Sequence, residues 1–264
     1  MICDPLFDFT GQVVLVTGGS RGLGYQMVKA FAARGGDMII ASRKIDNCKA
    51  VAAECRTMGR RALPFAAHVG KWAECDALIA AAYEEFGRID VLVNNAGNNG
   101  AAPSADIRKP FWEHGREVWN SAIEVNFYGV IHCASAVIPN MIERKGGRII
   151  TIISDAGRVG EPGMEVYSGA KAGAAGFMRG IARTLGRHHI TANCVAISAT
   201  ATPFTEKALN ADPERLKKMM ERYVIRRPGR PDDVANMALF LASDASSWIT
   251  GQTYAVNGGF SFGL

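Results

Sequence analysis

The sequence predicts an α/β fold built on a doubly wound, seven-stranded parallel sheet. Two observations lead to this fold class: short, nearly continuous apolar runs alternate with longer amphipathic runs, and a glycine-rich turn joins the first run of each kind. Strands that are apolar on both faces belong to parallel sheets with helices on both sides. Right-handed crossovers between such strands place the helices on the two faces in turn.

The elements follow one another in a regular order along the 264 residues. The apolar runs predicted to form strands are 13–16, 38–41, 62–67, 91–94, 149–153, 191–195 and 253–256. The amphipathic runs predicted to form helices lie near 23–34, 46–58, 73–86, 117–144, 165–187 and 232–242. Because no linker, repeat or low-complexity tract divides the chain, we expect a single domain over residues 1–264.

Two segments interrupt this rhythm. Residues 98–115 form a long polar and aromatic stretch, and residues 204–230 form a charge-rich, partly helical one. Both follow the carboxyl end of a predicted strand, which is where ligands bind in doubly wound folds. Long loops at such places are usually functional. We therefore expect 98–115 to be an active-site loop and 204–230 to be a lid over the substrate.

Composition narrows the class of protein. Apolar residues make up 48% of the chain and charged residues 21%, which suits a buried core rather than disorder. The net charge of +5 includes no long basic run, so it suits an anionic cofactor or substrate and we expect no nucleic-acid partner. The six cysteines form no Cys-x-x-Cys pair and have no metal-ligand spacing, which predicts reduced thiols and no metal site.

The chain also lacks the marks of membrane insertion or export. No stretch reaches the ~18 apolar residues of a membrane span. The N-terminus lacks the charged-then-apolar order of a signal peptide. We expect a soluble, cytoplasmic protein with no membrane partner.

The first chemical signal is a tyrosine–lysine pair. Tyr167 and Lys171 are spaced i, i+4, so a helix places them on one face, and Ser154 lies thirteen residues upstream of the tyrosine. A free tyrosine has a pKa near ~10, and an adjacent ammonium group lowers it toward neutrality. A nearby serine hydroxyl can hold a carbonyl or alcohol oxygen for proton transfer. The pair predicts an acid–base centre, although a half-buried tyrosine beside a solvated lysine gives the same spacing.

The second signal is the glycine-rich turn at 17–24, Thr-Gly-Gly-Ser-Arg-Gly-Leu-Gly, which follows the first predicted strand and opens the first helix. Glycines let the backbone turn sharply and approach a pyrophosphate, which binds the N–H groups at the start of a helix. At this place in a doubly wound pattern, the turn predicts a dinucleotide-binding loop.

This spacing resembles the short-chain dehydrogenase/reductase family, and within it the 3-oxoacyl-[acyl-carrier-protein] reductases. The resemblance covers nearly the whole chain and implies a Rossmann fold. The motifs that carry it are Asn94-Asn95-Ala96-Gly97, Asn126, the group Ser154, Tyr167 and Lys171, and the later signatures at Asn193, Thr202, 226–233 and 251–259.

The resemblance implies hydride transfer between a nicotinamide and a carbonyl carbon. Tyr167 exchanges the proton, Lys171 lowers the pKa of that tyrosine and binds the nicotinamide ribose, Ser154 positions the oxygen, and Asn126 maintains the proton relay. The resemblance also implies a homotetramer formed by helices near 117–144 and 165–187 and the C-terminal segment. The implied cofactor-binding residues are Gly18, Ser20, Arg21, Gly22, Leu23, Gly24, Arg43, Val69, Asn95, Ala96, Gly97, Tyr167, Lys171 and Thr202.

The end of the second strand favours NADP over NAD. Members that prefer NAD usually carry an acidic residue there, whereas this chain reads Ala41-Ser42-Arg43, and Asp37 comes too early. Arg21 and Arg43 can pair with a 2′-phosphate. The alternative is a pair of solvated arginines.

Three positions depart from the family pattern. His68 stands where an aspartate usually contacts the adenine, with Val69 still available to pack on the base. Ile197-Ser198 replaces a Pro-Gly pair after the sixth strand, which changes the backbone freedom of a turn beside the nicotinamide pocket. Asn257 replaces an aspartate common near the C-terminus, and we expect that change to be mild.

The expected substrate pocket is apolar, with cations on its lid. Its predicted wall consists of Asp155, Glu161, Met164, Glu165, Phe111, Trp112 and His114, with Phe204, Leu209, Met219, Met220 and Tyr223 from the lid. The cations of the lid are Lys207, Arg215, Lys217, Lys218, Arg222, Arg226, Arg227 and Arg230.

Three functions remain open. The first is an NADP-dependent ketone reductase or alcohol dehydrogenase. The second is a 3-oxoacyl-thioester reductase, in which the cations of the lid receive the phosphates of the thioester carrier. The third is a dinucleotide-binding regulator without turnover, against which the intact Ser154, Tyr167 and Lys171 argue.

Overall fold

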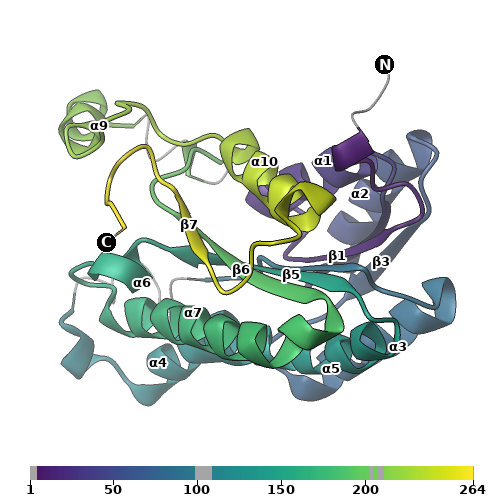
Figure 1. Ribbon diagram of the computed structural model, residues 1–264. Coiled ribbons are helices and arrows are strands. Elements are labelled where there is room, and N and C mark those ends of the chain that lie inside the picture. The colour runs from purple at the N-terminus through teal and green to yellow at the C-terminus, as the bar shows by residue number, and fades with distance from the viewer. Residues whose placement is uncertain (1–4, 99–108, 203–204, 207–210, 264) are drawn as a thin grey trace.

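The sheet has seven parallel strands in the order β3-β2-β1-β4-β5-β6-β7 (Figure 1). The computed structural model describes residues 5–98, 109–202, 205–206 and 211–263. The strands are β1 Val13–Thr17, β2 Asp37–Ser42, β3 Ala62–Ala66, β4 Val91–Asn94, β5 Gly147–Ser154, β6 Ile190–Ile197 and β7 Thr253–Val256. The predicted seven-stranded doubly wound sheet is therefore confirmed.

The order of the strands determines where along the edge of the sheet a ligand can bind. The chain starts at β1 in the middle of the sheet, moves outward to β2 and β3, and then returns to β4 on the other side of β1. The carboxyl ends of β1 and β4 therefore lie beside each other at the switch point, where crossovers leave in opposite directions. In such sheets a crevice forms at that point.

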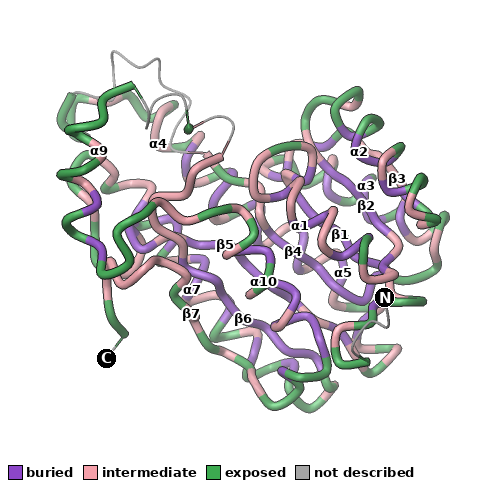
Figure 2. The backbone as a smooth tube through the Cα atoms, turned by 90° about the horizontal axis from the view of Figure 1, so that it is seen from above, coloured by how far each residue is buried: buried purple, intermediate pink, exposed green. Residues whose placement is uncertain are grey.

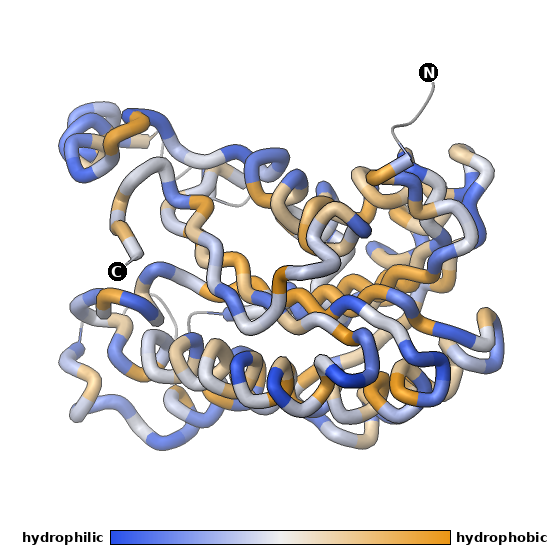
Figure 3. The backbone as a smooth tube through the Cα atoms, in the orientation of Figure 1, coloured by the Kyte–Doolittle hydropathy of each residue, from blue (hydrophilic) through white to orange (hydrophobic). Residues whose placement is uncertain are grey.

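Helices cover both faces of the sheet. One layer contains α1, α2 and α10, and the other contains α3, α5 and α7 (Figure 1). The longer helices are α1 Gly22–Ala32, α2 Ile45–Thr57, α3 Trp72–Phe86, α4 Arg116–Ile123, α5 Gly129–Glu143, α7 Glu165–Leu185, α9 Pro213–Met220 and α10 Pro231–Ala242. A short helix, α6, spans Ala156–Val159. Figure 3 shows the most hydrophobic stretches in the strands between the two layers.

The helix predicted near 117–144 is interrupted. Helix α4 passes into a π turn, η4 Glu124–Tyr128, before α5 continues. The run from Arg116 to Glu143 is long and apolar enough to cross a membrane by length and composition, although we expected no such segment. Its inward side chains, among them Val130 and Met141, belong to the core between the sheet and the helices. That packing is typical of a core helix in a globular protein.

The described parts of the two irregular segments lie at the carboxyl end of the sheet. Of the predicted lid, α9 is described, and it lies away from the sheet with a mostly exposed surface (Figure 2). Residues 99–108 of the predicted loop, and Phe204, Lys207 and Leu209 of the predicted lid, lie outside the described residues. The five described cysteines are buried free thiols.

Candidate active site

A cleft of about 970 Å³ opens at the switch point between β1 and β4. It collects twelve of the residues predicted to bind the cofactor: Gly18, Ser20, Arg21, Gly22, Leu23, Gly24, Arg43, Val69, Asn95, Ala96, Gly97 and Thr202. Lys44, Asn47, His68, Asn98 and Val125 are among the other residues of its lining.

The glycine loop forms one wall of this cleft because side chains are excluded from it. Gly18 and Gly22 have positive φ angles of 64° and 56°, which favour glycine. A Cβ at Gly24 would lie 2.2 Å from the carbonyl oxygen of Gly18. A Cβ at Gly22 would lie 3.7 Å from the side chain of Thr202, across the cleft. The loop is thus a backbone cradle at the N-terminus of α1, which suits a pyrophosphate.

The cradle is fastened to β4 by Thr17 and Asn95. The Thr17 hydroxyl accepts hydrogen bonds from the backbone N–H groups of Asn95 at 3.0 Å and Ala96 at 3.1 Å. It also lies within hydrogen-bonding distance of the Val93 carbonyl, at 3.3 Å. The Asn95 amide donates to the carbonyl oxygens of Thr17 and Gly18. Asn95 therefore supports the loop with its side chain, and Thr17 is a site residue that sequence reasoning missed, although it heads the glycine motif.

The far end of the cleft is cationic. Arg21, Arg43 and Lys44 contribute to the described lining, which contains no carboxylate. Asp37 lies at the start of β2, where its carboxylate accepts the Arg61 N–H at 2.8 Å. The Ser20 hydroxyl lies 2.8 Å from that of Ser42, which ties the glycine loop to the end of β2.

His68 and Val69 form the wall after β3. The His68 N–H donates to Glu74 at 2.7 Å, and the Nδ1 atom of its ring is buried without a partner among the described residues. Val69 is buried, and its carbonyl oxygen lies 2.9 Å from Nδ1 of His132. An imidazole edge thus stands at the position where the family usually has a carboxylate.

Ser154, Tyr167 and Lys171 come together where β5 ends and α7 begins. Ser154 is the last residue of β5, and its hydroxyl is hydrogen-bonded with the Tyr167 phenol. Both other residues lie near the start of α7, and the Lys171 ammonium is 5.9 Å from the centroid of the Tyr167 ring. The Lys171 Nζ atom donates to the Ile152 carbonyl at 2.8 Å. The juxtaposition expected from their spacing is therefore present.

The titration of this group differs from expectation. Burial raises the pKa of Tyr167 above its ordinary value, and the hydrogen bond with Ser154 partly offsets the rise. Burial lowers the pKa of Lys171 to about 8. Lys171 does not lower the pKa of Tyr167, because its own pKa of about 8 leaves it neutral at the higher pH where the buried phenol ionises.

Asn126 lies in the π turn, on the other side of Gly97. Its amide donates to the carbonyl oxygens of Asn98 at 2.7 Å and Ala122 at 2.9 Å. A Cβ on Gly97 would lie 2.9 Å from the Asn126 Oδ1 atom and 3.4 Å from the Lys171 Nζ atom. The asparagine and the lysine therefore face one another across a glycine. A π turn is frequent at functional sites because its extra residue reorients side chains.

The turn at Ile197-Ser198 is supported by hydrogen bonds. The Tyr223 hydroxyl lies 2.5 Å from the Ser198 hydroxyl and accepts the Ala199 N–H at 3.2 Å. The Gly229 N–H donates to the Ala199 carbonyl at 2.9 Å. These contacts hold the turn without the proline ring or the glycine that the family uses there. Thr202 follows and lies opposite Gly22 in the lining of the cleft.

Two expectations about the substrate wall are wrong. Asp155 does not face an open pocket, because its carboxylate is buried among Arg158, Asn257 and Ser261. The Asn257 amide donates to that carboxylate at 2.7 Å, whereas the aspartate common at this position would oppose two carboxylates. Tyr223 is likewise committed to the turn at Ser198 rather than to a ligand.

None of the remaining wall residues that the structure describes belongs to the lining of the cleft. Phe111 and Trp112 are exposed and in contact, with ring centroids 5.4 Å apart. Glu161 pairs with Arg222 of the lid at 3.6 Å. Met220 is buried, whereas Met219 and Met164 are half-buried.

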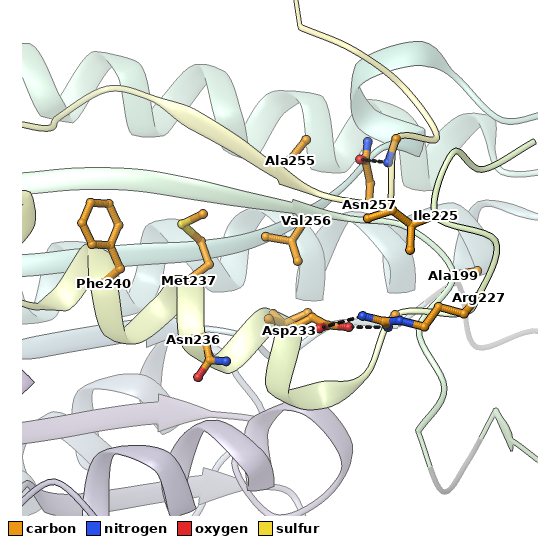
Figure 4. A pocket seen from close by; sticks show the side chains of 14 residues that line it. Ala199, Ile225, Arg227, Asp233, Asn236, Met237, Phe240, Ala255, Val256 and Asn257 are labelled. Carbon is orange, nitrogen blue, oxygen red and sulfur yellow. Dashed lines mark hydrogen bonds and ion pairs between the residues drawn. The ribbon is translucent and has the colours of Figure 1, made fainter.

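A second cavity, of about 610 Å³, lies between α10 and the end of β7 (Figure 4). Arg227, which we expected among the phosphate-binding cations of the lid, points to Asp233 there and donates to its carboxylate at 2.8 Å. The ion pair lowers the pKa of Asp233. Arg227 is therefore committed to the start of α10, and this cavity contains none of the predicted cofactor residues.

A doubly wound sheet with a glycine cradle at its switch point defines a dinucleotide-binding oxidoreductase. Comparison with known proteins agrees: the sequence profile of a family described as enoyl-(acyl carrier protein) reductase matches residues 18–261. The chain belongs to the short-chain dehydrogenase/reductase family and is similar to its 3-oxoacyl-acyl-carrier-protein reductases. It is an oxidoreductase of a family that uses nicotinamide cofactors.

Three relatives show the range of this similarity. A 3-oxoacyl-[acyl-carrier-protein] reductase from Synechocystis sp. is 40% identical over 95% of this chain and 97% of its own length. The (2S)-[(R)-hydroxy(phenyl)methyl]succinyl-CoA dehydrogenase subunit BbsD from Thauera aromatica is 37% identical, covering 95% and 96%. The crystal structure of a 7α-hydroxysteroid dehydrogenase complexed with NADH and 7-oxo glycochenodeoxycholic acid is 32% identical. It superposes with a TM-score of 0.88 over 98% of both chains.

Proposed function

We propose that this protein is an NADP-dependent reductase of ketones that also oxidises secondary alcohols in reverse. The observation that carries the proposal is the cluster of Ser154, Tyr167 and Lys171 at the end of β5, with Asn126 facing Lys171 across Gly97. This cluster adjoins the cleft through Gly97, which belongs to its lining. A nicotinamide dinucleotide, when bound in the cleft, supplies or accepts the hydride.

The residues of the cluster divide the remaining work. Ser154 holds the substrate oxygen within reach of the Tyr167 hydroxyl, which donates the proton as that oxygen becomes an alkoxide. Burial raises the pKa of Tyr167 and so favours its protonated phenol, which carries the proton that ketone reduction requires. Lys171 provides a cation for the nicotinamide ribose and the phenolate that remains. The Asn126 amide holds the Asn98 carbonyl in place beside Lys171. In the proposed relay, this is the side from which Tyr167 regains the proton that it has donated.

The cation end of the cleft supports NADP. Arg21, Arg43 and Lys44 line it without a carboxylate among the described residues, which suits a 2′-phosphate and lacks the acidic group that usually binds the ribose hydroxyls of NAD. We expect NADPH to bind at least about tenfold more tightly than NADH, with Arg43→Ala reducing that preference. Fluorescence titration with both dinucleotides measures it. Equal binding, or tighter binding of NADH, overturns this assignment.

Replacing Tyr167 with phenylalanine tests the mechanism. The variant loses the proton donor, so kcat for NADPH-dependent ketone reduction should fall by about 10²- to 10⁴-fold while NADPH still binds. The assay starts with cyclic ketones, aryl ketones and 3-oxoacyl thioesters, with NADH in parallel. Unchanged turnover in the variant rejects the role of Tyr167. A wild-type protein that binds NADPH and reduces none of these compounds supports the third function, a regulator without turnover.

A thioester substrate is the second candidate. Helix α9 presents Arg215, Lys217 and Lys218 on its exposed surface, above the active-site end of the sheet. Two of the relatives are named for acyl-carrier-protein or CoA substrates. A kcat/KM at least about a hundredfold higher for a 3-oxoacyl-CoA than for the matching free ketone, and reduced by Lys217→Ala, favours this candidate. Equal values favour the simple ketone.

We also propose that the enzyme is a cytoplasmic homotetramer with a small-molecule substrate. Support comes from the edge strand β7, since an exposed sheet edge is a surface on which another chain can pair. Trp248, just before that strand, is 98% exposed. Light scattering on the eluted protein gives the mass, and a mass of one subunit rejects the tetramer.

A further inference from the structure

The carboxylate of Asp155 is buried directly behind Ser154. Its side chain is 2% exposed, although charged side chains are seldom buried without partners. One oxygen accepts hydrogen bonds from Arg158 at 2.7 Å and Ser261 at 2.9 Å. The other accepts from the Asn257 amide at 2.7 Å. The carboxylate thus accepts hydrogen bonds from one guanidinium, one hydroxyl and one amide.

These partners connect two distant parts of the chain. Arg158 belongs to α6, which follows Ser154, whereas Asn257 and Ser261 belong to the segment after β7, residues 257–263, which we call the C-terminal segment. Arg158 also donates to the Ser261 hydroxyl at 2.9 Å. Figure 1 shows this segment running between α9 and α6. The turn after Ser154 and the C-terminal segment are therefore held together by charged hydrogen bonds.

The same turn is fixed to the neighbouring strand. The Asp155 N–H donates to the Ile197 carbonyl at 2.9 Å, at the end of β6. The Ala156 N–H donates to the Ser154 hydroxyl at 3.2 Å, so the orientation of that hydroxyl depends on the backbone that Asp155 anchors.

On its other side, the C-terminal segment supports the end of the lid. The rings of Phe260 and Tyr223 pack with centroids 5.1 Å apart, and the Arg222 guanidinium lies 4.6 Å from the centroid of the Phe260 ring. The Ile225 N–H donates to the Gly258 carbonyl at 2.8 Å. The segment therefore lies between the turn after Ser154 and the residues that follow α9.

We propose that Asp155 is a positioning residue for the substrate site, which fastens the C-terminal segment to the turn after Ser154 and so fixes the wall between that turn and the lid. The proposal builds on the proposed reductase function. Arg158 compensates the charge of Asp155, so that a carboxylate can stand next to Ser154 without an uncompensated negative charge beside the reacting oxygen.

The experiment compares Asp155→Ala, Asn257→Asp and the double variant Asp155→Asn with Asn257→Asp, all in the full chain. Asp155→Ala removes the acceptor, and Asn257→Asp opposes two carboxylates. The double variant restores a donor facing an acceptor, although the Ser261 carbonyl loses the donor it now has at 2.9 Å. Asp244→Asn is the control, because this 84% exposed partner of Arg148 lies at the opposite end of β5.

Amide hydrogen exchange of residues 257–263 measures how firmly the C-terminal segment is held, and it requires no substrate. We expect about tenfold or faster exchange in each single variant, partial recovery in the double variant and no change in the control. NADPH affinity should stay within about twofold in all of them, because the cleft is elsewhere. For a ketone that the wild type reduces, KM should rise by about fivefold or more in both single variants and fall back in the double variant.

The proposal is overturned by unchanged exchange in both single variants, by a double variant no better than Asn257→Asp, or by faster exchange with unaltered KM. A parallel loss of NADPH affinity also overturns it, since that indicates general damage. Failure of the proposed function gives a different result. If the protein reduces no ketone, the exchange rates of residues 257–263 still show whether Asp155 holds the C-terminal segment.

Discussion

The proposed cofactor end of this site, which is the cleft at the glycine loop, and the proposed substrate end, around Asp155, Tyr223 and Asn257, are built in different ways. The cofactor end is a surface of backbone atoms: glycines whose missing Cβ atoms leave room, and N–H groups at the start of α1. The substrate end is assembled from side chains that meet from several elements. Asp155, Tyr223 and Asn257 there bind one another or the strand ends.

This difference decides how each end responds to change. A surface of closely packed backbone atoms has no room for an added side-chain atom. A network of side chains, in contrast, accepts substitutions as long as its hydrogen-bond donors and acceptors still match. The family relatives differ in the substrates for which they are named while sharing the fold. A backbone cradle beside a side-chain network that can be rebuilt allows one fold to act on different substrates.

The largest effect should come from adding a methyl group to the cradle. In Gly24→Ala the new Cβ would lie 2.2 Å from the Gly18 carbonyl oxygen and 2.6 Å from the Asn95 amide, so the loop must move. We expect NADPH affinity to fall by about a hundredfold or more, measured by fluorescence titration. The control is Gly180→Ala in α7, where the added Cβ meets nothing within 4 Å. It should raise the free energy of unfolding by about 0.5–1 kcal/mol. Normal NADPH binding by Gly24→Ala contradicts the steric account.

Lys171 should reveal the cost of a buried charge. Burial lowers its pKa from 10.5 to about 8, so between these values the unfolded chain binds a proton that the folded chain has lost. Stability from this group therefore increases as the pH rises from about 8 to 10.5, and the penalty is complete below pH 8. Lys171→Met should be more stable than wild type at pH 7, by up to about 3 kcal/mol, and inactive.

Urea unfolding at pH 7 and pH 10 measures this difference. The advantage of the methionine variant should shrink at the higher pH, where the native lysine is neutral. A Lys171→Met protein that is less stable than wild type at pH 7 contradicts the prediction and indicates that the bond to the Ile152 carbonyl outweighs desolvation. The site would then gain stability from its lysine rather than lose it.

The sequence predicted twelve of the residues that line the cleft. Local rules govern it: a positive φ at Gly18 and Gly22, a strand before and a helix after, and a fixed order of parallel strands. The sheet and most helices followed from the period of apolar residues for the same reason. Thr17 was missed because its role depends on β4 lying beside β1, a contact between residues 78 apart in the chain.

The substrate end was predicted less well because its interactions join distant residues. The bond between Asp155 and Asn257 spans 102 positions, and nothing in the sequence near either residue indicates the other. Tyr223 was expected to face a ligand, yet its hydroxyl completes a turn 25 residues away. The π turn at Asn126 was also invisible, because one extra residue in a helical turn leaves the surrounding apolar pattern unchanged.

Removing the hydroxyl of Thr17 should affect the cofactor end less than the methyl group on Gly24. Thr17→Val keeps the shape of the side chain but leaves the N–H groups of Asn95 and Ala96 without their acceptor. We expect a loss of about 2 kcal/mol in the free energy of unfolding, together with about tenfold weaker NADPH binding. Urea unfolding and fluorescence titration measure the two. Thr17→Ser, which retains the hydroxyl, should preserve both; a similar loss in Thr17→Ser shifts the explanation to packing.

The smallest effect should follow from removing one hydroxyl at the substrate end. Tyr223→Phe leaves the ring packed on Phe260 but deprives the Ser198 hydroxyl and the Ala199 N–H of their partner. Because Ser198 is half-buried and water can replace part of the bond, we expect a loss of about 1 kcal/mol in stability. Tyr254→Phe is the control, since no hydrogen bond of that hydroxyl occurs in the described part of the chain. If Tyr223→Phe and Tyr254→Phe unfold at the same urea concentration, the turn after β6 is held by its backbone, as at the cofactor end. A lower urea midpoint for Tyr223→Phe alone, which no substitution of Ser198 by a residue without a hydroxyl restores, leads to the opposite conclusion. The turn is then held by a side-chain hydrogen bond in place of the rigid Pro-Gly pair.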